Sequence, residues 1–269
     1  MPFLSIVTID NVAQFFLKFG HQTFINPIIV AAMVFHKREP YLRAACLLCI
    51  AMIFNTLLKE LFQVPLMLHL GKGYAFPSGH MHAATIFYGY IMCKAPQKAA
   101  KALLFLVICG IGLSLVHRNY HSYIDVLGAC AFAVVEILIC RELETKLGSA
   151  ALTVIALIFS SLVVVALSFA NKIDLHIWIA VYAMLGFISG AAIFPEKPLI
   201  NRKQKIAALI LFAVSVCLVI FLHTLFGFGK SAHAYIRYTK YLLIPVSLFG
   251  SIFVAVYVER LIGRHSFKT

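Results

Sequence analysis

The sequence predicts an all-α integral membrane protein, a polytopic bundle of about nine membrane-spanning helices. Hydrophobic residues make up 62% of the 269 positions and charged residues only 12%, and the mean hydropathy is +0.95. A soluble domain carries about 25% charged residues, so this chain has too few polar side chains to cover a soluble fold. Apolar runs of spanning length also recur along the chain, separated by charged residues, Gly or Pro.

The first 21 residues are expected to form an amphipathic segment that lies in the membrane interface, because "FLSIVTIDNVAQFFLKFG" mixes apolar and polar positions. This segment lacks the basic start and uninterrupted apolar core of a cleavable signal. The nine predicted spans follow it, at 22–37, 41–62, 78–94, 100–117, 122–141, 150–170, 175–194, 205–226 and 240–261.

The basic residues set the predicted orientation. The formal net charge is +13, yet the Lys and Arg residues lie in short loops between apolar runs. Anionic lipid headgroups are therefore the expected partners, and nucleic acid is not. The predicted loops place fifteen of the 23 Lys and Arg residues on one side of the membrane. The richer side is expected to be cytoplasmic, which places the N-terminus outside and the C-terminus inside.

Three polar segments that are distant in the sequence are predicted to reach the same, extracytoplasmic side. They are Lys59 at the end of one span, the turn Ser78-Gly79-His80 before another, and the segment "HRNYHSYID" at 117–125. Ionisable residues at membrane depth are candidates for function. We therefore expect the three segments to form one site.

The stretch "FPSGH" predicts a helix start that can bind an anion. Ser78 is a favourable N-cap, and the first N–H groups of a helix have no partner within it. With the helix dipole, these groups attract an anion. Gly79 lets a ligand approach the backbone closely, and His80 stands in the first turn. A plain helix start with an incidental histidine is the alternative.

Two cations and a histidine–carboxylate pair complete the predicted constellation. His121 and Asp125 are four residues apart and share a helix face, so the carboxylate can orient the imidazole. Arg118 has a fork suited to phosphate oxygens, and Lys59 can clamp them. The alternatives are that Asp125 closes a capping box with Ser122 and that Lys59 extends to lipid headgroups.

This inventory suits phosphoryl transfer through a histidine without a metal or another cofactor. Cations and backbone amides neutralise the phosphoryl oxygens. One histidine attacks phosphorus, and the other protonates the leaving oxygen.

These residues resemble the motifs of the type 2 phosphatidic acid phosphatase superfamily, which are K-x6-R-P, P-S-G-H and S-R-x5-H-x3-D in this order. "FPSGH" matches the second motif, "HSYID" matches the end of the third, and "NTLLKELFQVP" is similar to the run into the first. The resemblance covers roughly residues 20 to 145. It implies a catalytic membrane core at 22–145, followed by further spanning helices at 146–269 whose role the motifs do not indicate.

The resemblance also implies a role for each matching residue. His121 would be the nucleophile that forms a phosphohistidine, Asp125 would orient it, and His80 would be the general acid. The phosphate would be bound by Lys59, Ser78, Gly79 and Arg118.

Two departures from the family motifs concern the phosphate-binding cations. Leu66-Met67 stands where the family has Arg-Pro, and Lys72 is the candidate replacement. Arg118 precedes His121 by three residues where the family has six, so it need not occupy the position of the family's arginine.

The expected function is hydrolysis of a lipid phosphate or diphosphate at the extracytoplasmic face. Two alternatives stay open. One is transfer of a phospho-headgroup to another molecule, as in the sphingomyelin-synthase-like relatives, which the short "HSYIDV" segment also resembles. The other is a lipid-binding or transport protein that kept the fold without the chemistry.

Overall fold

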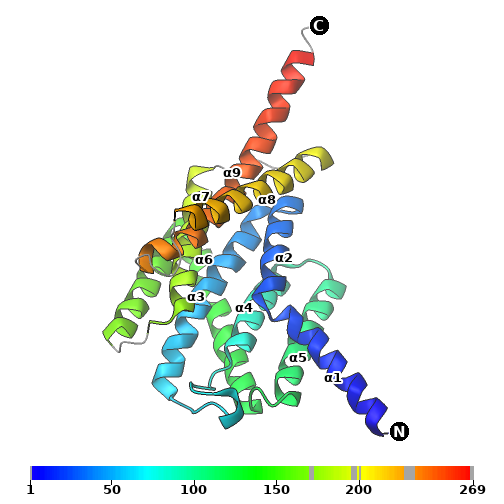
Figure 1. Ribbon diagram of the computed structural model, residues 1–269, viewed down its shortest axis with the longest axis vertical. Coiled ribbons are helices and arrows are strands. Elements are labelled where there is room, and N and C mark those ends of the chain that lie inside the picture. Colours follow the sequence, from blue (N-terminus) through cyan, green and yellow to red (C-terminus); the bar gives the residue numbers. More distant parts are fainter. Residues whose placement is uncertain (1, 170–172, 195–198, 200, 227–233, 267–269) are drawn as a thin grey trace. The chain divides into compact units, whose positions relative to one another are not determined.

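The computed structural model describes residues 2–169, 173–194, 199, 201–226 and 234–266. This part of the chain is helical with no strand, which confirms the predicted all-α class (Figure 1). The helices are α1 (Pro2–Phe19), α2 (Gln22–Phe35), α3 (Arg38–Phe62), the short 3-10 helix η1 (Leu68–Leu70), α4 (Gly79–Lys94), α5 (Lys98–His117), α6 (Tyr123–Phe169), α7 (Leu175–Ile193), α8 (Arg202–Leu225) and α9 (Ala234–Ser266).

Six helices of the described part are long and apolar enough to cross a membrane, rather than the nine spans predicted. They are α3, α5, α6, α7, α8 and the segment Arg237–Val258 of α9. The helices α2 and α4 have 14 and 16 residues, fewer than the roughly 20 that a spanning helix needs. The six candidates fit an integral, multi-pass membrane protein.

The helix α6 accounts for part of the difference in number. It is 47 residues long, with non-helical angles at Gly148 (φ 78°, ψ 173°). The ring of Phe54 lies 6.4 Å from that of Phe132 and 5.7 Å from that of Phe159. A straight helix would separate Phe132 from Phe159 by roughly 40 Å, so α6 turns back on itself at Gly148. Its two arms correspond to the predicted spans 122–141 and 150–170.

The chain divides into two compact units that do not follow the order of the sequence. Unit 1 contains Met1–Ile28 and Leu47–Ile177, and unit 2 contains Ile29–Cys46 and Trp178–Thr269. The predicted site residues, from Lys59 to Asp125, all belong to unit 1.

Unit 1 is built around α4. The side chains of Ile86, Phe87 and Tyr90 in α4 have no exposed surface, and α4 packs against both α5 and α6. Most residues of α4 from Met81 to Tyr90 are buried, so this helix is surrounded by protein rather than by lipid. The helix α1 packs against α5, where the Phe16 ring occupies the space that a β-carbon would take at Gly110.

Unit 2 depends on close approach between helices. A β-carbon at Gly186 of α7 would stand 2.4 Å from the carbonyl oxygen of Leu242 in α9, and one at Gly190 would meet the Phe249 ring at 2.3 Å. These two glycines form a G-x-x-x-G face, which lets membrane helices pack backbone to backbone. In addition, α8 packs along α9.

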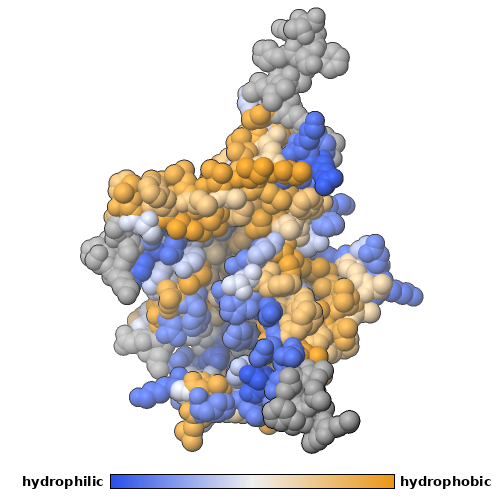
Figure 2. Space-filling view, turned by 45° about the vertical axis from the view of Figure 1, so that its right-hand side comes forward, coloured by the Kyte–Doolittle hydropathy of each residue, from blue (hydrophilic) through white to orange (hydrophobic). Residues whose placement is uncertain are grey.

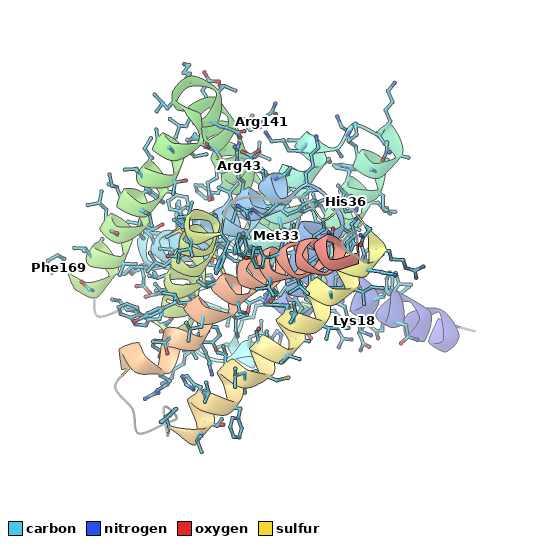
Figure 3. All side chains as sticks on the ribbon, turned by 90° about the horizontal axis from the view of Figure 1, so that it is seen from above. Lys18, Met33, His36, Arg43, Arg141 and Phe169 are labelled. Atoms are coloured by element: carbon cyan, nitrogen blue, oxygen red, sulfur yellow. The ribbon has the colours of Figure 1, made fainter. Side chains whose placement is uncertain are left out.

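The surface carries the apolar side chains that a bilayer requires. Leu103, Leu106 and Leu113 of α5 are each more than half exposed. Phe169, the last residue of α6, is 85% exposed and projects away from the helix (Figure 3). Hydrophobic residues cover broad areas of the face seen in Figure 2. In water such areas would be a liability, whereas lipid tails can cover them.

Candidate functional site

The three predicted segments meet at one end of unit 1. The backbone N–H of Ser78 donates a hydrogen bond of 3.1 Å to the carbonyl oxygen of Asp125, which joins the start of α4 to the start of α6. The ammonium group of Lys59, at the end of α3, donates to the carbonyl oxygen of Tyr74. Figure 1 shows the 63–78 segment and the junction of α5 with α6 at the same end of these helices.

The start of α4 has the predicted capping geometry. The helix begins at Gly79, and the Ser78 hydroxyl accepts a hydrogen bond of 3.4 Å from the N–H of Met81. Ser78 is fully buried, and its hydroxyl and its N–H are both engaged. The first-turn N–H groups of Gly79 and His80 have no intrahelical partner, and the His80 side chain is exposed. Gly79 and His80 are therefore better placed than Ser78 to meet a ligand.

His121 and Asp125 lie close together in unit 1. The Nδ1 atom of His121 is 3.7 Å from Oδ2 of Asp125, within ion-pair range but beyond a hydrogen bond. Both side chains are buried, with exposed fractions of 8% and 4%, and Nδ1 of His121 has no hydrogen-bond partner.

The alternative role of Asp125 as a cap is also present. Its Oδ2 accepts a hydrogen bond of 2.8 Å from the N–H of Ser122, and its own N–H donates one of 3.2 Å to the Ser122 hydroxyl. These two bonds form the capping box that "SYID" predicts. The carboxylate therefore faces both the helix start and the imidazole, so its position allows both roles.

The electrostatic environment keeps His121 neutral. Burial and, next, the positive charge of Lys59 lower the pKa of His121 to about 4, although the Asp125 carboxylate acts in the opposite direction. The charge of His80 contributes in the same direction as Lys59. A neutral imidazole carries the free electron pair that a nucleophile needs.

Arg118 does not point into this group of residues. Its Nη1 atom donates a hydrogen bond of 3.1 Å to Oδ1 of Asp10 in α1, and Nε2 of His117 lies 3.1 Å from the same oxygen. Hydrogen bonds from Arg118 and His117 lower the pKa of Asp10. In this conformation Arg118 ties α5 to α1, and the charges that lower the pKa of His121 come from Lys59 and His80.

Lys72 is exposed at the tip of the loop between α3 and α4. The loop is closed by a hydrogen bond of 2.9 Å from the N–H of Leu66 to the carbonyl oxygen of Gly73. The neighbouring Gly71 and Gly73 have φ angles of 93° and 143°, which a residue with a side chain rarely adopts. Leu66 and Met67 lie in the same loop.

A buried polar chain that was not predicted from the sequence lies below the α4 turn. The amide nitrogen of Asn55 in α3 lies 3.1 Å from Nδ1 of His82 in α4, and Nε2 of His82 lies 2.6 Å from Oε1 of Glu136 in α6. His82 has no exposed surface. One feature of the sequence could have predicted this chain. These three polar residues lie inside apolar spans, where polar side chains require partners.

His176 of α7 was also missed as a neighbour of the site. Its Nε2 atom lies 2.9 Å from the Thr56 hydroxyl of α3, one turn before Lys59. No cluster of three or more His, Cys, Asp or Glu side chains suited to a metal ion occurs among the residues that the structure describes.

Comparisons with protein-family models, with curated proteins and with solved structures find no match for this chain.

Proposed function

We propose that the protein is an integral membrane phosphatase that hydrolyses a lipid phosphate or lipid diphosphate through a phosphohistidine. One observation carries the proposal. The hydrogen bond from Ser78 to Asp125 joins the "FPSGH" turn to the "HSYID" segment. A helix start suited to an anion, a buried neutral imidazole and a carboxylate thus belong to one end of one unit. The motif resemblance supports the same chemistry.

The proposed reaction has two displacements at phosphorus. In the first, Nε2 of His121 attacks phosphorus, because Nδ1 faces Asp125. The bond from phosphorus to the leaving oxygen breaks, and His80 protonates that oxygen. In the second, water attacks the phosphohistidine, His80 accepts the proton of this water and so regains its acid form, the N–P bond breaks and inorganic phosphate leaves. Asp125 stabilises the imidazolium that forms. Lys59 and the first-turn N–H groups of α4 stabilise the phosphoryl oxygens.

An open apolar groove beside this site, whose lining residues Leu113, Tyr123 and Leu127 are more than half exposed, supports a substrate with a long hydrocarbon tail. Its volume is about 570 Å³, within the range of roughly 300–1,000 Å³ that ligand pockets occupy. It lies between α4, α5 and α6, and Met81, Val116 and Val126 line the end nearest the site. Met92, Cys93 and Leu138 line the other end. From Met81 to Cys93, α4 rises roughly 18 Å.

Phosphate release tests the proposed function. Wild type, His121→Ala and His117→Ala would be assayed in detergent against phosphatidic acid, a prenyl diphosphate and glucose 6-phosphate. We expect release from at least one lipid and a fall of at least about 10³-fold for His121→Ala, because the nucleophile is lost. His117→Ala is the matched control, because this histidine faces Asp10 rather than the site. Equal rates for all three proteins would refute the phosphohistidine mechanism, and full activity that requires a divalent ion would refute a metal-free one.

Headgroup transfer is the second candidate, and the bonding of Arg118 to Asp10 favours it. With Arg118 bonded to Asp10, fewer cations are available to bind the phosphoryl group. A smaller set of cations is typical of the sphingomyelin-synthase-like transferases that the "HSYIDV" segment resembles. The two reactions differ in their product. A transferase should release little inorganic phosphate without an acceptor, whereas a phosphatase should release it at full rate.

We also propose that the site faces the extracytoplasmic side of the membrane. The distribution of Lys and Arg supports an extracytoplasmic site. Single cysteines introduced at positions 72 and 203 of a variant without native cysteines should react with an impermeant thiol reagent from opposite sides. Reaction of both from one side would overturn this orientation.

A further inference from the structure

The polar chain below the α4 turn has a single consistent direction of hydrogen bonding. The amide nitrogen of Asn55 lies 3.4 Å from the carbonyl oxygen of Pro77 and 3.1 Å from Nδ1 of His82. A carbonyl oxygen only accepts, so the amide group donates to it, and its second hydrogen is directed at Nδ1. With Nδ1 as acceptor, a neutral imidazole carries its proton on Nε2 and donates it to Oε1 of Glu136 over 2.6 Å.

Asn55 also determines how closely the turn approaches α3. A β-carbon at Gly79 would stand 3.3 Å from Oδ1 of Asn55, so the amide group lies directly against the first residue of α4. Any shift of this amide moves the Pro77 carbonyl, Gly79 or both. These are the residues on either side of Ser78, and His80 follows them.

Glu136 is poorly suited to a purely structural role. Its side chain is 12% exposed, and Oε2 is buried without a hydrogen-bond partner. An unpaired buried carboxylate oxygen lowers stability, and an apolar residue would suit the surrounding apolar side chains of α6 better. The carboxylate does, however, supply a strong acceptor for His82.

We propose that Glu136 is a positioning residue, which acts through His82 and Asn55 to hold the Pro77–His80 turn in the orientation that its histidine needs. This inference rests on the proposed function and adds to it. Glu136 lies on α6 but not in the turn itself, so it contacts no reacting atom. It acts by fixing the direction of each hydrogen bond between α6 and the turn.

The direction of the hydrogen bonds gives a test with nearly isosteric variants. Glu136→Gln keeps an acceptor for His82 and should retain kcat within about threefold of wild type. Asn55→Asp can donate to neither Pro77 nor His82 and should lower kcat about 10- to 100-fold, because small misplacements at an active site have effects of this order. Glu136→Leu, which removes the acceptor, should lower kcat similarly. KM should change less than kcat in each variant, measured with hexadecyl phosphate.

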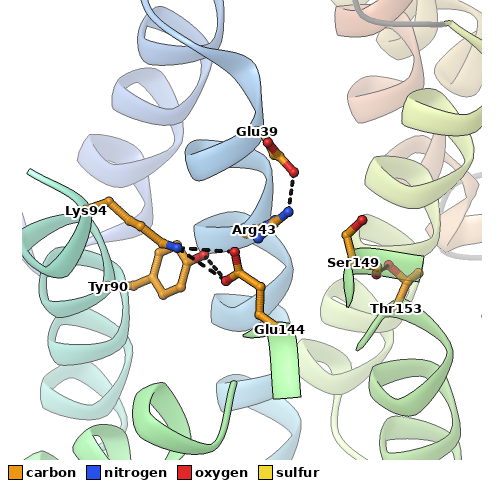
Figure 4. Close-up of polar contacts among 7 residues, drawn as sticks. All are labelled: Glu39, Arg43, Tyr90, Lys94, Glu144, Ser149 and Thr153. Carbon is orange, nitrogen blue, oxygen red and sulfur yellow. Dashed lines mark hydrogen bonds and ion pairs between the residues drawn. The ribbon is translucent and has the colours of Figure 1, made fainter. Parts of the chain in front are cut away.

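A control at the other end of α4 separates positioning from general stability. The Tyr90 hydroxyl donates to Oε2 of Glu144 over 3.4 Å, and Lys94 pairs with the same carboxylate (Figure 4). Tyr90→Phe removes one buried hydrogen bond from α4 without touching the turn. It should lower the thermal midpoint and leave kcat unchanged.

Hydrogen–deuterium exchange of the peptide that contains Met81 provides a readout without activity. The N–H of Met81 bonds to the Ser78 hydroxyl, so a loosened turn should exchange faster in Asn55→Asp and Glu136→Leu than in Glu136→Gln and Tyr90→Phe. If wild type hydrolyses no phosphate ester, the proposed function fails, and the exchange rates still decide the positioning role. Wild-type exchange in Asn55→Asp and Glu136→Leu would overturn that role, as would wild-type kcat in an active protein. A loss in Glu136→Gln equal to that in Glu136→Leu would overturn the proposed acceptor role.

Discussion

The two units differ in what their helices bury. Of the twelve buried polar or charged side chains in the described part of the chain, nine belong to unit 1 and three to unit 2. In unit 1, polar groups such as Asn55, His82 and Asp125 bridge neighbouring helices or helix starts. In unit 2, the glycines of α7 bring its backbone directly against α9.

This difference leads us to assign different roles to the two units. Buried polar groups in a membrane protein lower stability unless they are paired, and they commonly mark functional sites. Glycine-mediated packing needs no polar groups and stabilises helix association through close contact. Unit 1 therefore fits the proposed reactive site, and we propose that unit 2 is a structural scaffold. Substitutions in the two units should affect different measured quantities.

The largest expected effect is that of Asp125→Asn in unit 1. Asparagine is also a good cap, so the bond from the Ser122 N–H is retained while the charge next to His121 is lost. We expect the thermal midpoint to change little and kcat for phosphate release to fall by about 10²- to 10⁴-fold, as for carboxylates that orient a catalytic histidine. Activity would be measured on protein shown to be folded by size-exclusion chromatography.

Asp125→Ala provides the comparison for this variant, because it removes both the cap and the charge. It should lose activity similarly and also lower the unfolding free energy by about 1 kcal/mol. Wild-type activity in Asp125→Asn would show that capping is the only role of this carboxylate.

A smaller effect, confined to stability, is expected for Gly186→Val in unit 2. The new β-carbon would stand 2.4 Å from the Leu242 carbonyl oxygen, so α7 and α9 must separate. Overpacking of this kind costs about 1–3 kcal/mol, which thermal unfolding in detergent would detect. Gly250→Ala is the milder control, since its β-carbon meets a ring atom of Phe194 at 3.3 Å. A fall in kcat per folded molecule would contradict the assignment of unit 2 as a scaffold.

The smallest expected effect is a shift in pH dependence. Because the pKa of His121 is lowered from 6.5 to about 4, its neutral, nucleophilic form persists until the pH falls through about 4. Lys59→Met removes the second-largest cause of this lowering. It should lower kcat/KM at every pH, because Lys59 binds the phosphoryl oxygens in the proposed mechanism, and its acid limb should in addition move upward in pH. Lys94→Met, a charge removal at the other end of α4, should leave the limb in place. A wild-type limb near pH 6.5 would contradict the burial of this imidazole.

The free energy of unfolding should also depend on the titration of His121. Between pH 6.5 and about 4 the unfolded chain protonates His121 while the folded chain does not. Folding therefore loses stability as the pH falls through this window, and the contribution of this group is fully present above it.

Local patterns in the sequence predicted the helix starts well. Ser78 and Ser122 cap α4 and α6 as expected, because capping depends on residues within one turn of each other. The meeting of 78–80 with 121–125 was also predicted, since alternating spans return the chain to the same side. The sequence did not predict contacts between side chains of different helices. No spacing in the sequence pairs His82 with Glu136, or Arg118 with Asp10.

The lengths of the apolar runs predicted the membrane spans less well than local patterns predicted the helix starts. Apolar runs at 22–37 and 78–94 predicted spans of full length, but α2 and α4 have only 14 and 16 residues. The short α4 still carries the chain away from the site end of unit 1, and α5 returns it there. Hydropathy does not distinguish a helix surrounded by protein from one surrounded by lipid, and α4 is of the first kind. The roles assigned to the site residues and to segments 1–21, 22–145 and 146–269 stay predictions.

The reversal at Gly148 has a consequence for everything that follows it in the chain. A continuous 47-residue helix would extend roughly 70 Å, more than twice the bilayer core of roughly 30 Å. Because the helix instead folds back, α7 begins at the end of unit 1 where α6 started, which places His176 against Thr56. The backbone angles of one glycine thus set where the second arm of α6 ends and where α7 begins within unit 1.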